Sequence, residues 1–158
     1  MKRALFRILF GGIAGNALSV DIGLVVLRVA AGVLLCVLSY GVLFHAGGWG
    51  PPPWFVEHVT KLGFPAPLGF AWLALLSEFL GGMLMALGLL TRLTALLNAV
   101  TTGVAAFGHH EHPTGDGLPA LAMCVMTTVV LVAGPGRFSL DALARWFQPP
   151  RLAPPPRS

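Results

Sequence analysis

The sequence predicts an all-α polytopic membrane protein: a bundle of four transmembrane helices with a short outer interfacial helix. Composition is the first observation, because 56% of the 158 residues are hydrophobic and only 10% are charged, against roughly 25% charged in an average soluble domain. The second is that the apolar residues form four runs near the length of about 20 that a membrane-spanning helix needs. The mean hydropathy of +0.80 agrees. Low charge excludes a disordered chain, and two cysteines are too few for a disulfide-stapled secreted domain.

Each apolar run ends where helix-breaking or polar residues begin. The first contains a single charge, Arg28, and is followed by seven residues of Gly, Trp and Pro at 47–53. The second contains only Glu78 and ends before Arg92. A His-rich loop follows the third run, and Pro135 ends the fourth. The expected spans are residues 22–44, 68–90, 93–108 and 117–134.

The basic residues predict the orientation, because Lys and Arg accumulate in short cytoplasmic loops. Eight of the ten precede the first span, lie between the second and third, or follow the fourth. The other two loops contain only Lys61, and Arg28 lies within a span. We therefore expect a multi-pass protein with both termini in the cytoplasm. The net charge of +4 is explained by this orientation, and we expect no nucleic-acid partner.

Three segments flank or connect the spans of the membrane domain, residues 21–147. Residues 1–20 begin with basic residues and are expected to lie at the membrane interface; a cleaved signal peptide is the alternative, although Arg7 interrupts its apolar region. Phe55, Val59 and Leu62 share one helical face and predict a short helix lying flat on the outer surface. The Pro-rich tail, residues 148–158, is expected to be disordered.

Three motifs resemble the DoxX family of small bacterial membrane proteins. The longest is LLSEFLGGMLMALGLLTR at 75–92; LGFPAPL at 62–68 precedes it, and GPGRFSLD at 134–141 follows the last span. The resemblance covers about residues 20–141. It implies a four-helix bundle in the bacterial inner membrane, with relatives associated with quinol oxidation, thiosulfate:quinone oxidoreduction and oxidative-stress complexes.

One departure from the family pattern concerns the end of the first span. Members often have His-Gly-x-x-Lys there, whereas this chain has Tyr40-Gly41-Val42-Leu43-Phe44. Any chemistry that the family's His and Lys perform is therefore in doubt in this protein. His45, one residue beyond the Lys position, is a partial substitute.

Glu78 and Arg28 are the candidate intramembrane polar centre. A carboxylate near the middle of a span costs roughly 2.5–3.5 kcal/mol on insertion scales unless it is paired or protonated, so Glu78 should face the bundle interior. Arg28 is its expected partner, since the two depths differ by roughly 7 Å and a long Arg side chain spans that gap. Either the pair only fixes helix packing, or Glu78 relays protons or binds a polar head group such as a quinone carbonyl.

Histidines on the predicted outer side are the next candidates. His109, His110 and His112 flank Glu111 in one loop, and His45 is expected on the same side. His110 matches a histidine that is common at this point in the family. Imidazoles bind zinc or copper or admit protons, but the spacing is no recognised ligand pattern. Solvated loop histidines remain the simpler interpretation, so no metal site is assigned.

The remaining candidates have structural explanations. Cys36 and Cys124 are single thiols expected to pack as small apolar side chains, so no Cys-x-x-Cys redox centre is expected. Haem is not expected either, because no span contains a His. Arg92 and Arg137 lie at the inner interface, where anionic lipid or a docked partner would contact them.

These observations lead to a membrane subunit of a redox or quinone-linked system as the functional hypothesis. The redox centre would come from a bound quinone or from a membrane or soluble oxidoreductase partner, and whether the chain itself is catalytic stays open. A small proton-coupled transporter component, working as a homo-oligomer, is one alternative. A non-catalytic membrane scaffold is the other.

Overall fold

The computed structural model describes residues 17–108 and 117–146. Most of the predicted N-terminal segment, the loop histidines His109, His110 and His112, and the Pro-rich tail lie outside these residues. The described elements are α2 (Ala17–Leu43), β1 (Phe44–His45), β2 (Gly48–Trp49), α3 (Pro53–Lys61), α4 (Pro67–Leu87), α5 (Thr91–Gly108), α6 (Gly117–Ala133) and α7 (Leu140–Trp146).

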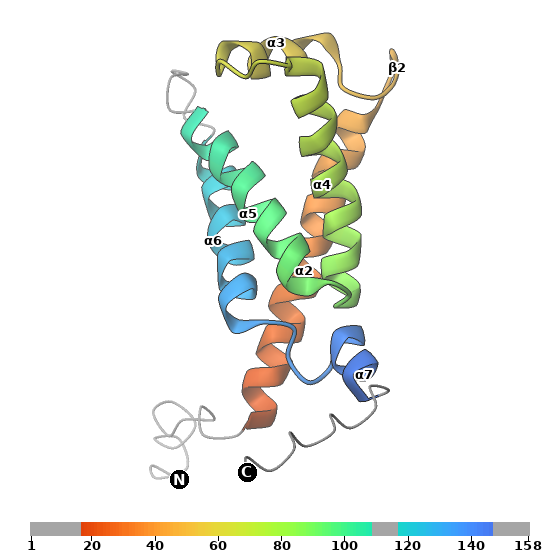
Figure 1. Ribbon diagram of the computed structural model, residues 1–158, viewed down its shortest axis with the longest axis vertical. Coiled ribbons are helices and arrows are strands. Elements are labelled where there is room, and N and C mark those ends of the chain that lie inside the picture. The colour runs from red at the N-terminus through yellow and green to blue at the C-terminus, as the bar shows by residue number, and fades with distance from the viewer. Residues whose placement is uncertain (1–16, 109–116, 147–158) are drawn as a thin grey trace, which may run out of the picture.

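Four long helices, α2, α4, α5 and α6, lie side by side and form the bundle (Figure 1). The helix α3 crosses one end of it and α7 lies at the other; these are called the α3 end and the α7 end below. Packing is closest between α5 and α6 and between α2 and α4, and α4 also contacts α5. The predicted all-helical architecture is confirmed, apart from a two-residue antiparallel pairing of β1 with β2 in the expected loop.

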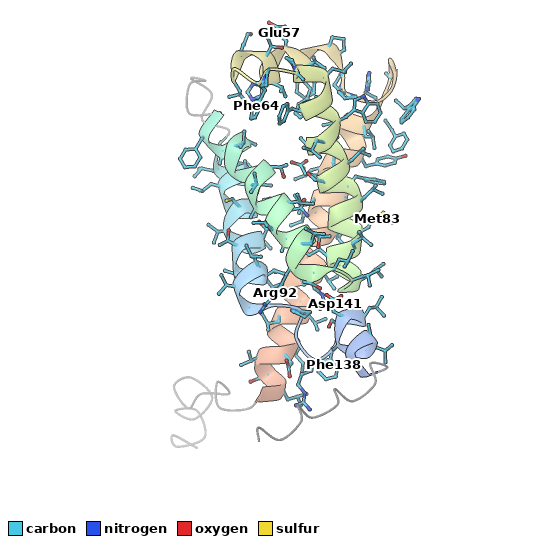
Figure 2. The ribbon with its side chains drawn as sticks, viewed as in Figure 1. Glu57, Phe64, Met83, Arg92, Phe138 and Asp141 are labelled. Atoms are coloured by element: carbon cyan, nitrogen blue, oxygen red, sulfur yellow. The ribbon has the colours of Figure 1, made fainter. Side chains whose placement is uncertain are left out.

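The interior of the bundle is narrow, and many large apolar side chains point outward. Small and medium-sized side chains fill the centre, among them Ala31, Leu35, Met85, Ala95 and Val130. The outward valines of α2 are typical of a surface that faces lipid, where backbone groups are satisfied within each helix. Figure 2 shows such side chains projecting along the bundle, with Met83 on the outside of α4.

Two of the described helices are long and apolar enough to cross a membrane: Leu18–Leu43, with a hydropathy of 2.5, and Pro67–Leu87, with 1.8. The helix α6 is apolar but shorter. The helix α5 is less apolar because its buried face carries polar residues, which are Thr91, Thr94, Asn98 and Thr102. The structure therefore supports two candidate spans within a four-helix bundle.

Glycines allow a close contact between α2 and α4. A Cβ on Gly32 would lie 2.5 Å from the carbonyl oxygen of Gly82, and one on Gly82 would lie 2.8 Å from that of Gly32. The helix α4 ends at Leu87, three residues before the predicted end of the span, because the left-handed backbone of Gly88, at φ +74°, turns the chain towards α5.

Candidate functional site

An apolar cavity between α3, α4 and α5 is the candidate site. Its volume is about 210 Å³. The helix α3 and the following turn contribute Phe55, His58, Val59, Leu62 and Phe64; α4 contributes Phe70, Leu73, Ala74 and Glu78; α5 contributes Val100, Thr101, Val104 and Ala105. Glu78 and His58 are thus the two titratable side chains in a wall that is otherwise almost wholly apolar.

Glu78 lines this cavity together with Ala74, which lies one turn before it on the same face of α4. Gly82, one turn after Glu78, packs against Gly32 and Cys36 of α2. Within residues 17–108 and 117–146, no hydrogen bond or ion pair reaches the Glu78 carboxyl. The side chain is partly buried, so the carboxyl is available to a molecule that enters the cavity.

His58 belongs to the site although the sequence analysis did not select it. It projects from α3 into the same cavity, and its Nε2 would lie 3.5 Å from a Cβ on Gly108 at the end of α5. A signal was present in the sequence, because His58 lies three residues after Phe55 and four before Leu62 and therefore shares their face. The predicted short helix is confirmed as α3, and Val59 is buried beneath it.

Glu57, the neighbour of His58, points away from the cavity. Its carboxylate accepts a hydrogen bond from Lys61 at 2.9 Å, and both side chains are about two-thirds exposed. This hydrogen bond and the positive charge of Lys61 lower the pKa of Glu57. Glu57 is therefore an ordinary surface carboxylate next to the site.

Arg28 does not join Glu78, so the expected pair is not formed. Its guanidinium donates to the carbonyl oxygen of Pro135 and, at 2.8 Å, to that of Phe138, and it lies against Gly88. Glu78 is ten residues before Gly88 on α4, about 15 Å away at roughly 1.5 Å per residue. The depth estimate from the sequence was too small because it did not include the register of α2 against α4.

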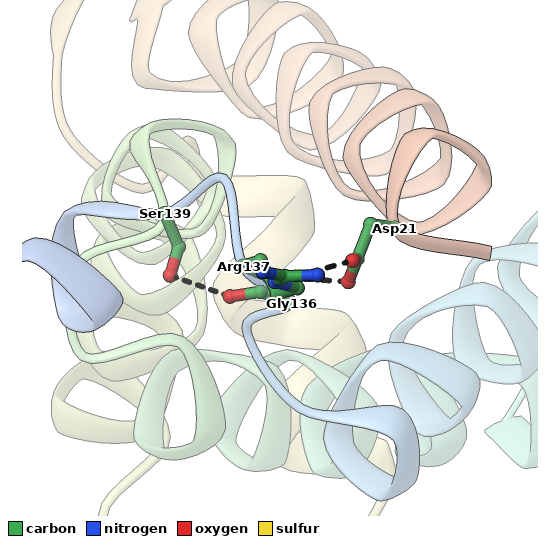
Figure 3. Close-up of polar contacts among 4 residues, drawn as sticks. All are labelled: Asp21, Gly136, Arg137 and Ser139. Carbon is green, nitrogen blue, oxygen red and sulfur yellow. Dashed lines mark hydrogen bonds and ion pairs between the residues drawn. The ribbon is translucent and has the colours of Figure 1, made fainter. Parts of the chain in front are cut away.

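Backbone and side-chain contacts of the segment after α6 hold the α7 end together. Asp141 accepts hydrogen bonds from the backbone N–H groups of Leu90 and Thr91, each at 2.8 Å, and so caps the start of α5. Asp21 accepts one from the Arg137 N–H at 3.2 Å, and its carboxylate lies 3.9 Å from the Arg137 Nε (Figure 3). The sequence analysis selected neither aspartate. Asp141 lies in the first turn of α7, which was the available signal for it.

Other candidates lie apart from the cavity. His45 is in β1, where its Nδ1 is buried without a hydrogen-bond partner among the described residues. Arg92 lies beside Gly134 at the α7 end. The thiols are also separate: Cys36 donates to the carbonyl oxygen of Phe79 and Cys124 to that of Ala99. In the described part of the chain, no three His, Cys, Asp or Glu side chains come together as metal ligands.

The fold and the cavity define a small helical membrane protein with an acidic side chain facing an apolar site. The model of the DoxX family matches residues 23–111, more than half of the chain. The protein belongs to the DoxX family and is an integral inner-membrane protein. The resemblance expected from the three motifs is thereby confirmed.

Three curated relatives match over most of their own length. The inner membrane protein YqjF of Escherichia coli K12 is 32% identical over 122 residues, which are 71% of this chain and 91% of that protein. The inner membrane protein YphA of the same strain is 27% identical over 75% of this chain and 87% of its own length. An uncharacterized Haemophilus influenzae protein is 28% identical over 77% and 89%. No solved structure matches the chain.

Proposed function

We propose that this protein is the membrane subunit of a redox or quinone-linked system, and that its cavity holds the head group of a lipid-soluble quinone. One observation carries the proposal: Glu78, the acidic residue within α4, lines a cavity whose walls are otherwise nearly all apolar or aromatic. The resemblance to the DoxX family, which implies relatives associated with quinol oxidation, supports it as well.

The size and lining of the cavity fit a ring-shaped head group. A volume of about 210 Å³ is below the roughly 300–1,000 Å³ of pockets that enclose drug-sized ligands, so the isoprenoid tail would lie outside it in the bilayer. Phe64 and Phe70 lie with ring centroids 4.6 Å apart at its edge. Aromatic rings of this kind pack favourably against another ring.

Glu78 and His58 would supply the polar contacts. A protonated carboxyl donates to a quinone carbonyl, and a carboxylate accepts from a quinol hydroxyl. The imidazole of His58 donates or accepts in the same way from the α3 side, and either group holds a proton that the ring gains or loses. A bound quinone would supply the two-electron chemistry, and a membrane or soluble oxidoreductase would be the electron partner.

The membrane arrangement is part of the proposal. We place all four bundle helices across the inner membrane, with the α7 end and both termini in the cytoplasm. Support comes from Arg92 and Arg137, which both lie at the α7 end, as the accumulation of positive charge on the cytoplasmic side requires. The cavity then opens near the outer side, below α3.

Binding of a short-chain ubiquinone to the purified protein in lipid nanodiscs tests the proposal. We expect saturable quenching of tryptophan fluorescence. In Glu78→Leu we expect about tenfold weaker binding, because the hydrogen bond to the head group is lost. Glu57→Gln is the matched control, since it removes a nearby carboxylate that points away from the cavity, and its affinity should equal that of the wild type.

Two outcomes would contradict the proposal: no saturable binding to the wild type, or equal affinity in Glu78→Leu. Proton-coupled transport, the alternative that also uses Glu78, would instead give substrate-dependent proton flux in liposomes that Glu78→Gln abolishes. A scaffold would give neither result.

A further inference from the structure

The buried face of α5 carries a row of polar side chains that the proposed quinone site does not use. Thr91 and Asn98 are fully buried, and Thr94 and Thr102 are 3% and 4% exposed. These residues recur every three or four positions and therefore lie on one face of the helix. Polar groups buried at this depth are costly unless something satisfies them.

These side chains do not hold the helices together. Thr94 donates to the carbonyl oxygens of Leu90 and Thr91, and Thr102 donates to that of Asn98 at 2.6 Å. The Asn98 Nδ2 likewise donates to the Thr94 oxygen of its own helix at 2.9 Å. Interhelical hydrogen bonding, the common role of polar residues within membranes, therefore does not explain this row.

Two side-chain oxygens of the row have no hydrogen-bond partner among the described residues. The Asn98 Oδ1 and the Thr91 Oγ1 are buried and have no hydrogen-bond partner among the described residues. Buried oxygens of this kind are usually satisfied by ordered water. Gly81 lets the Asn98 side chain pack closely against α4, because a Cβ there would lie only 3.0 Å from the Asn98 Nδ2.

The row runs between two cavities. Thr91 lines a second cavity of about 210 Å³ at the α7 end, together with Arg92 and Asp141. Near the other end of the row, Thr101, the neighbour of Thr102 on α5, lines the cavity of Glu78. Asn98 lies against Gly81, one turn from Glu78 on α4, and thus between the two cavities.

We propose that the polar face of α5, centred on Asn98, is a water-mediated proton path from the α7 end to Glu78. A proton leaves water in the α7-end cavity, passes along hydrogen-bonded water past Thr94 and Asn98, and binds the Glu78 carboxylate to form a carboxyl. No electrons move in this step. The inference rests on the proposed function only in that both use Glu78; it specifies how that site receives its protons.

The charged groups lie at the two ends of the path, with Arg92 and Asp141 at the α7-end cavity. His58 is the titratable group that shares the cavity with Glu78, and it lies on the α3 side. Arg28 is held by the carbonyls of Pro135 and Phe138, beside the entrance and not along the path. Between the entrance and Glu78 the row is uncharged, so no fixed cation in it opposes the proton.

Hydrogen–deuterium exchange of the Glu78 carboxyl tests the path directly. Infrared spectra are recorded of the protein in nanodiscs at low pH, and the carboxyl C=O band that disappears in Glu78→Gln is assigned to Glu78. Rapid mixing with D₂O then gives the rate at which this carboxyl exchanges its proton. We expect exchange about tenfold or more slower in Asn98→Leu, because the side chain removes polar groups and adds a barrier to water. Thr94→Val should slow it too, and this near-isosteric variant serves if Asn98→Leu does not fold.

Ser39→Ala is the matched control. The Ser39 hydroxyl is also buried, and it donates to the carbonyl oxygen of Leu35 in its own helix. Ser39 lies on α2, one turn from Cys36 towards the α3 end, and therefore not on the polar face of α5. Its exchange rate should equal that of the wild type. An unchanged rate in Asn98→Leu, or equal slowing in Ser39→Ala, would overturn the path. Quinone binding is measured on the same samples, so a failure of the quinone proposal is seen separately.

Discussion

At the scale of single residues, the two charges within the predicted spans have different surroundings. Arg28 has a fork of donors, and it uses two of them on carbonyl oxygens of the chain after α6. Glu78 accepts hydrogen bonds or, when protonated, donates one, and no described group meets it. Arg28 therefore stabilises the fold, whereas Glu78 is free to contact a ligand.

Arg28→Leu should destabilise the protein. The variant loses the hydrogen bonds to Pro135 and Phe138, and charge-assisted bonds of this kind contribute about 1.5–3 kcal/mol each. We expect a lower thermal unfolding temperature in detergent, followed by circular dichroism, with Arg28→Lys intermediate because it keeps the charge. Wild-type stability in Arg28→Leu would show that these bonds are unimportant.

At the scale of elements, the turn between α4 and α5 depends on a segment far along the chain. Gly88 ends α4, and its carbonyl oxygen accepts a hydrogen bond from the Asp141 N–H at 2.9 Å. The Asp141 carboxylate in turn caps α5. The GLL and SLD parts of two separate motifs, at residues 88–90 and 139–141, thus form one structural unit.

The contact between α2 and α4 yields a second stability prediction. Gly32→Ala should cost about 1–3 kcal/mol, as overpacking generally does, because the new Cβ would lie 2.5 Å from the carbonyl oxygen of Gly82. Gly23→Ala on the same helix is the control: nothing lies within 4 Å of its Cβ, and the better helix propensity of Ala should stabilise by about 0.5–1 kcal/mol. Both are measured by thermal unfolding in detergent, and equal effects would contradict the packing.

At the scale of the whole molecule, the two ends of the bundle differ in character. The α3 end carries the side chains of α3 that line the cavity and the exposed ion pair of Glu57 with Lys61. The α7 end carries buried aspartate and arginine contacts between distant segments. Figure 2 labels Glu57 and Phe64 at the first end and Arg92, Phe138 and Asp141 at the second. The proposed orientation places the first end outside the cell membrane and the second in the cytoplasm.

Cysteine labelling tests this orientation. In a background with Cys36→Ala and Cys124→Ala, Glu57→Cys should react with an impermeant maleimide in intact spheroplasts. Ala144→Cys, on the exposed side of α7, should react only after permeabilisation. The reverse pattern would contradict the proposed orientation.

Much of the fold was predictable from local sequence. Glycine, proline and polar residues set the ends of the helices within a few positions of the expected spans, because they act on the backbone where they occur. The short helix over the outer loop followed from periodicity alone. The surroundings of Arg28 and His58 could not be predicted in this way. The carbonyl partners of Arg28 and the cavity that His58 lines are formed by segments that only folding brings together.

The sequence by itself determined the class of protein, its helices and the presence of two unusual intramembrane charges, because composition and periodicity are local properties of the chain. Only the tertiary structure decided what those charges face. The glycine contact between α2 and α4 fixes their register and carries Arg28 to the loop after α6, while α3 and α5 enclose Glu78 with His58. Register and enclosure arise from packing between distant segments, which no single stretch of sequence specifies.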